Sequence, residues 1–87
     1  MIPAGLAANV LKIATQAPCN EALSLVKVVQ MLFEAETKQA RVERNLIIIN
    51  ALRMLHDIEA TATDNKVKEA AKALIEHLAA RIEIRPA

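Results

Sequence analysis

Few side chains in this 87-residue sequence could do chemistry: it holds one cysteine, two histidines and ten acidic residues. His56 and Glu59 are three apart, which places them on one helical face, but a zinc site needs three or four ligands. Di-iron bundles use Glu-x-x-His motifs, and neither Glu34, Glu59 nor Glu76 has a histidine three residues later. We therefore expect no metal site and no cofactor.

Nucleophilic and phosphate chemistry have equally little support. Cys19 is the only cysteine, so it cannot form an internal disulfide, and no Lys, Arg or His lies close in sequence to activate its thiol. A free cysteine of this kind is more often a small buried residue. Gly5 is the only glycine, which excludes a glycine-rich phosphate loop. We expect no catalytic site, and hence a protein that is not an enzyme.

Composition and length narrow the class of protein further. The chain is 54% hydrophobic with a formal charge of +1, and its length predicts a single domain over residues 1–87. No apolar run approaches the roughly 20 residues of a membrane span, and the start lacks the basic segment of a secretory signal. We expect no membrane partner and a cytoplasmic location, with the nucleus as the alternative.

The elements that would position these residues all show helical spacing. Residues 3–17 place apolar side chains at i, i+4, i+7 and i+8. A second helix is predicted from Cys19 or Asn20 to Lys38, with Asn20 able to cap it. That segment is apolar on most of its circumference, which predicts a central helix.

The third segment, from Gln39 or Arg41 to Ala62, is predicted to be a separate helix or the continuation of the second. Its apolar residues occupy two nearly opposite sides, one of which holds Val42, Leu46 and Ile49. A clear break follows at residues 61–65, where Asp64 or Thr63 can cap a last helix. Residues 67–82 carry one apolar stripe, and the alternating residues 81–86 predict a frayed turn or a short extended tail.

One stretch resembles a known repeat. Residues 64–78, DNKVKEAAKALIEHL, are similar to the second helix of a HEAT or armadillo-type repeat, with an Asp at the turn, a pair of alanines and leucines along one face. Residues 51–58 resemble the first helix of such a pair, so the similarity covers about residues 50–82. The resemblance implies a helical scaffold that binds proteins.

Together these patterns predict an all-α fold: a three- or four-helix bundle, or a short α-solenoid-like array, that is oligomeric. The apolar excess favours a second chain covering part of the surface, most simply in a homodimer. We expect Ile47 and Ile48 both to be buried, one of them against a second chain. The candidate interaction surface comprises Leu46, Ile47, Ile48 and Met54.

The predicted function is a non-enzymatic protein–protein interaction or scaffolding module that binds itself or another helical protein. The alternative is a small nucleic-acid-binding regulator that uses residues 38–53. Lys38, Arg41, Arg44 and Arg53 make this region loosely basic. Interleaved acidic residues and the near absence of aromatic side chains for base stacking disfavour it.

Overall fold

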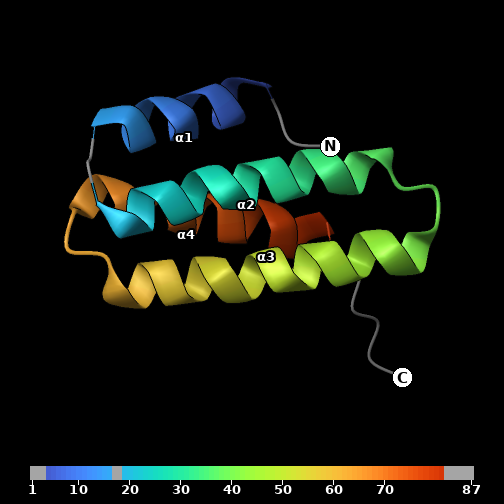
Figure 1. Ribbon diagram of the computed structural model, residues 1–87. Coiled ribbons are helices and arrows are strands. Elements are labelled where there is room, and N and C mark those ends of the chain that lie inside the picture. Colours follow the sequence, from blue (N-terminus) through green and yellow to red (C-terminus); the bar gives the residue numbers. More distant parts are fainter. Residues whose placement is uncertain (1–3, 17–18, 82–87) are drawn as a thin grey trace.

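The computed structural model describes residues 4–16 and 19–81, and every regular element in these two stretches is an α-helix (Figure 1). The helices are α1 (Ala4–Gln16), α2 (Asn20–Thr37), α3 (Arg41–Thr61) and α4 (Asn65–Arg81). The predicted all-α fold is confirmed, and the described residues form four helices, a number that the sequence left open between three and four. The C-terminal residues 82–87, for which a turn or tail was predicted, lie outside the described residues.

Each helix runs antiparallel to the one before it, which gives an up-and-down four-helix bundle (Figure 1). α2 packs on α1 and on α3, α3 packs on α4, and α4 returns to contact α1 and α2. α1 is the shortest helix and lies along only the first part of α2 (Figure 1). Short connections force this antiparallel order, because they leave no length for a crossover.

The core is built from the inward apolar faces predicted by the helical spacing. Alanines supply much of it and let the helices approach closely, since interaxial distance depends on the side chains at the contact. None of the described residues contributes a buried polar or charged side chain. The largest fully buried side chains come from all four helices: Val10, Leu25, Val28, Val29, Leu55, Val67 and Leu74.

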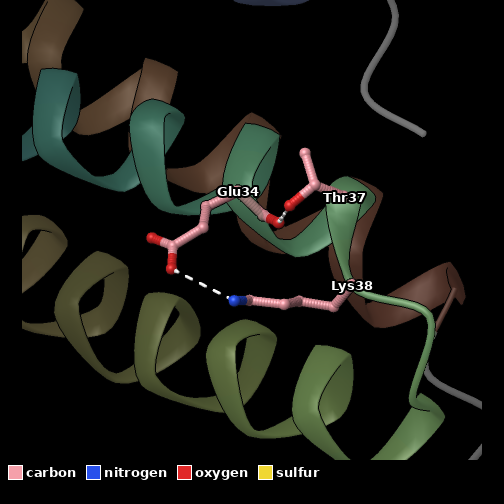
Figure 2. Close-up of polar contacts among 3 residues, drawn as sticks. All are labelled: Glu34, Thr37 and Lys38. Carbon is pink, nitrogen blue, oxygen red and sulfur yellow. Dashed lines mark hydrogen bonds and ion pairs between the residues drawn. The ribbon is translucent and has the colours of Figure 1, made fainter.

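The connection between α2 and α3 settles whether residues 19–62 form one helix or two. Lys38 and Ala40 both have extended backbone angles, so the helix cannot continue through them. At the end of α2 the Thr37 hydroxyl donates a 2.7 Å hydrogen bond to the Glu34 carbonyl (Figure 2). Lys38 Nζ lies 3.9 Å from Glu34 Oε1, in an exposed pair of the kind that stabilises little. This turn uses no glycine or proline, because extended angles suit any residue.

The predicted caps differ in outcome. Asp64 Oδ1 accepts a 2.8 Å hydrogen bond from the Lys66 N–H, which confirms the break before α4 and its cap. The proposed cap of α2 was wrong: Asn20 is already the first helical residue, and Cys19 occupies the N-cap position without a side-chain hydrogen bond. Ala40, at the N-cap of α3, likewise has no capping side chain.

Candidate interaction surface

The four residues of the predicted interaction surface do not share one face of α3. Leu46 is 56% exposed, on the side of the helix turned away from the core. Ile48 and Met54 are half-buried and pack against the core from opposite flanks, and Ile47 is half-buried on the same side of α3 as Met54, two turns before it. Contact of Ile48 with the core agrees with half of the expectation for the isoleucine pair. Its other half, contact with a second chain, stays a prediction.

Two residues that the predicted surface omitted line up with Leu46 instead. Val42 is 71% exposed and Ile49 is 47% exposed, at positions four before and three after Leu46. Successive helical residues are about 100° apart, so these three side chains project within about 60° of one another. We call Val42, Leu46 and Ile49 the outer stripe. The signal for it was present in the sequence as the second apolar side of this segment.

The opposite side of α3 supplies its share of the core. Ala51, Leu55 and Ile58 are buried there, nearly diametrically opposite the outer stripe. A helix at the surface of a monomer usually has one apolar stripe and one polar face. α3 departs from that rule, because the outer stripe is apolar too, and the described helices cover only the face that holds Ala51, Leu55 and Ile58.

Polar residues surround the outer stripe. Arg53 continues its line four residues after Ile49, and Asn45 and Asn50 flank it, all of them exposed. Glu43 is exposed next to Val42. An apolar centre with a polar rim is the usual anatomy of a protein–protein contact.

Other exposed apolar side chains are dispersed over two helices. Leu11 on α1 and Leu23 and Phe33 on α2 each expose more than a third of their surface. Leu23 and Phe33 are ten residues apart on α2 and so are separated by nearly three helical turns. Single exposed apolar residues are normal on soluble proteins, so we assign the candidate surface to α3 alone.

The basic residues of the 38–53 region do not gather on one face. Arg41, Arg44 and Arg53 project from α3 in three directions that differ by 60° or more, and Lys38 is turned toward Glu34. Exposed Glu43 and Asp57 stand among them. This arrangement lacks the clustered basic face through which proteins hold a phosphate backbone.

The candidate metal ligands in residues 4–16 and 19–81 are dispersed. Within these stretches no three His, Cys, Asp or Glu residues lie together as metal ligands would. Cys19 is half-buried at the start of α2. A shallow open groove of about 260 Å³ lies between α1 and α4, but its walls offer only Lys66, Glu69 and Asn9 beside apolar side chains. The absence of metal binding by His56, His77 and Cys19 stays a prediction.

The four helices described here include none that is both long and apolar enough to cross a membrane.

Comparison with known proteins adds no relative. The chain matches no protein-family model, and neither the curated proteins nor the solved structures yield a match. The resemblance of residues 50–82 to a HEAT or armadillo-type pair therefore stays a prediction.

Proposed function

We propose that this protein is a non-enzymatic interaction module that associates with a second copy of itself through the outer stripe of α3. The observation that supports the proposal is the exposure of Val42, Leu46 and Ile49, which on average leave more than half of their surface in water. They lie along one side of a helix whose opposite side is buried in the core. Apolar side chains held in water at helical spacing gain free energy when a second surface covers them. A second copy offers the same stripe.

The exposed area sets the strength of the expected contact. Between them the three side chains leave less than two whole side chains' worth of apolar surface in water. Covering it would contribute about 4–5 kcal/mol per chain, or about 8–10 kcal/mol per pair. Association itself costs at least about 4 kcal/mol. We therefore expect weak dimerisation, half complete at roughly 0.1–1 mM.

The test is molecular mass as a function of concentration, by sedimentation equilibrium or light scattering from about 0.02 to 2 mM, a range that brackets the expected midpoint. The 9.5 kDa chain should approach twice its mass at the upper end. Leu46→Asp should stay monomeric throughout, because an unpaired charge would replace the centre of the stripe. Leu23→Asp is the matched control, since Leu23 is 70% exposed on α2, away from the stripe.

Each result bears directly on the proposal. Dimerisation that Leu46→Asp abolishes and Leu23→Asp leaves unchanged supports it, provided that both variants keep their helical circular dichroism. A chain that stays monomeric at 2 mM overturns self-association, as does a dimer unaffected by Leu46→Asp. Retention of that monomer on DNA at low salt would point to the alternative, nucleic-acid binding.

A further inference from the structure

The spacing of the outer stripe is that of a coiled-coil seam. Val42, Leu46, Ile49 and Arg53 follow one another in steps of four, three and four residues. Such a repeat keeps the side chains along one line, and two helices that share it pack in layers. The seam of α3 is therefore three apolar residues followed by one cation, and this asymmetry makes the direction of the second helix matter.

A parallel pair of seams places like charges together. With the two α3 helices parallel, every seam residue faces its own copy, so the two Arg53 side chains share one layer. Their guanidinium groups always carry charge, and like charges that face each other across an interface destabilise it. The nearest carboxylate on α3 to that layer is Asp57, one turn after Arg53 on each helix.

An antiparallel pair avoids this repulsion and gains an attraction. When Leu46 of each chain faces Ile49 of the other, Arg53 of each chain faces Val42 of the other, which stands next to Glu43. The aliphatic stem of arginine can cover the valine while its guanidinium reaches the carboxylate. Two-fold symmetry repeats the contact at both ends of the apolar centre.

Both charged partners are free for this contact. Arg53 and Glu43 are exposed, and neither forms an ion pair within the described part of the chain. Arg53 lies in the seam and Glu43 flanks it beside Val42, so an antiparallel two-fold brings Arg53 of each chain next to Glu43 of the other. Resting on the proposed function, we infer that α3 pairs antiparallel with α3 of a second copy, with Leu46 against Ile49 and Arg53 against Glu43.

Charge reversal tests the pairing. Arg53→Glu and Glu43→Arg should each weaken dimerisation about tenfold, because each creates two like-charge contacts. The double variant, with both residues reversed, should return to within about threefold of the wild-type dissociation constant. Arg44→Glu is the matched control: Arg44 is exposed on α3 but outside the seam, and its reversal should leave dimerisation unchanged.

Cross-linking gives a second readout of direction. In a Cys19→Ser background, chains with Leu46→Cys and chains with Ile49→Cys are mixed and oxidised. The antiparallel pair favours the mixed disulfide, because positions 46 and 49 face each other. A parallel pair favours disulfides between identical chains.

The outcomes separate this inference from the proposed function. A wild-type chain that never dimerises overturns both. If the wild type dimerises but the double reversal variant stays weak, or the cysteine variants form mainly disulfides between identical chains, the antiparallel register is wrong while self-association still holds. Recovery of affinity in the double variant together with mixed disulfides supports the inference.

Discussion

A leucine-to-alanine substitution should cost different amounts of folding stability on the two faces of α3. Leu55 is fully buried, so Leu55→Ala removes a side chain from the core and leaves a cavity. That change typically costs 2–5 kcal/mol, and we expect about 3 kcal/mol. Leu46 is 56% exposed, so less than half of its surface is shielded from water in the folded chain, and Leu46→Ala removes little buried area. The expected cost there is about 1 kcal/mol or less.

Urea unfolding followed by circular dichroism at 222 nm measures both free energies of unfolding. The protein concentration should stay near 10 µM, well below the expected dimerisation range, so that only intrachain packing is compared. A domain of this size has about twice the stability that Leu55→Ala removes, so both variants remain measurable. Equal costs at the two positions, or a larger cost at Leu46, would refute the orientation of α3 described above.

Four further substitutions test local features of the fold, each by the shift in free energy of unfolding. Ala40→Asp should stabilise by about 1 kcal/mol, because α3 lacks a capping side chain at that position; no gain would argue against α3 starting at Arg41. Asp64→Ala should cost about 1 kcal/mol by removing the bond to the Lys66 N–H, whereas the same change at exposed Asp57 should be nearly neutral. Gly5→Ala should stabilise by about 0.5–1 kcal/mol, since a Cβ there meets open space inside α1; a loss of stability would contradict the helix. His77→Leu should stabilise by about 1 kcal/mol, because Nε2 is buried without a hydrogen-bond partner; destabilisation would indicate that this nitrogen has one.

Much of the fold could be predicted because helical spacing records which side chains face the core. The α4 stripe that contains Val67, Leu74 and Leu78 is buried as its spacing predicts. Asp64 could be identified as a cap because a carboxylate just before an apolar helical stripe can accept a hydrogen bond from the first helical N–H groups. The turn between α2 and α3 could not be decided, since extended angles at Lys38 and Ala40 need no special residue. The cap of α2 was misplaced by one residue for a similar reason.

The candidate surface was harder to predict than the fold. Residues 46–49 are all apolar, so this run alone does not say which of them points away from the core. That depends on where α2 and α4 pack against α3, which turns Ile48 toward the core and Leu46 away from it. Longer spacing carries the missing information: Val42 and Ile49 extend the line of Leu46, whereas Met54 extends the line of Ile47.

The most direct test of the central claim, self-association through the outer stripe, is a series of nitrogen–proton NMR spectra recorded from about 0.05 to 2 mM, which spans the expected midpoint. We predict amide shifts that grow with concentration and concentrate on α3 from Val42 to Arg53, while the amides of α4 stay in place. Spectra that do not change over this range, or changes centred on α1 or α4, would contradict the claim.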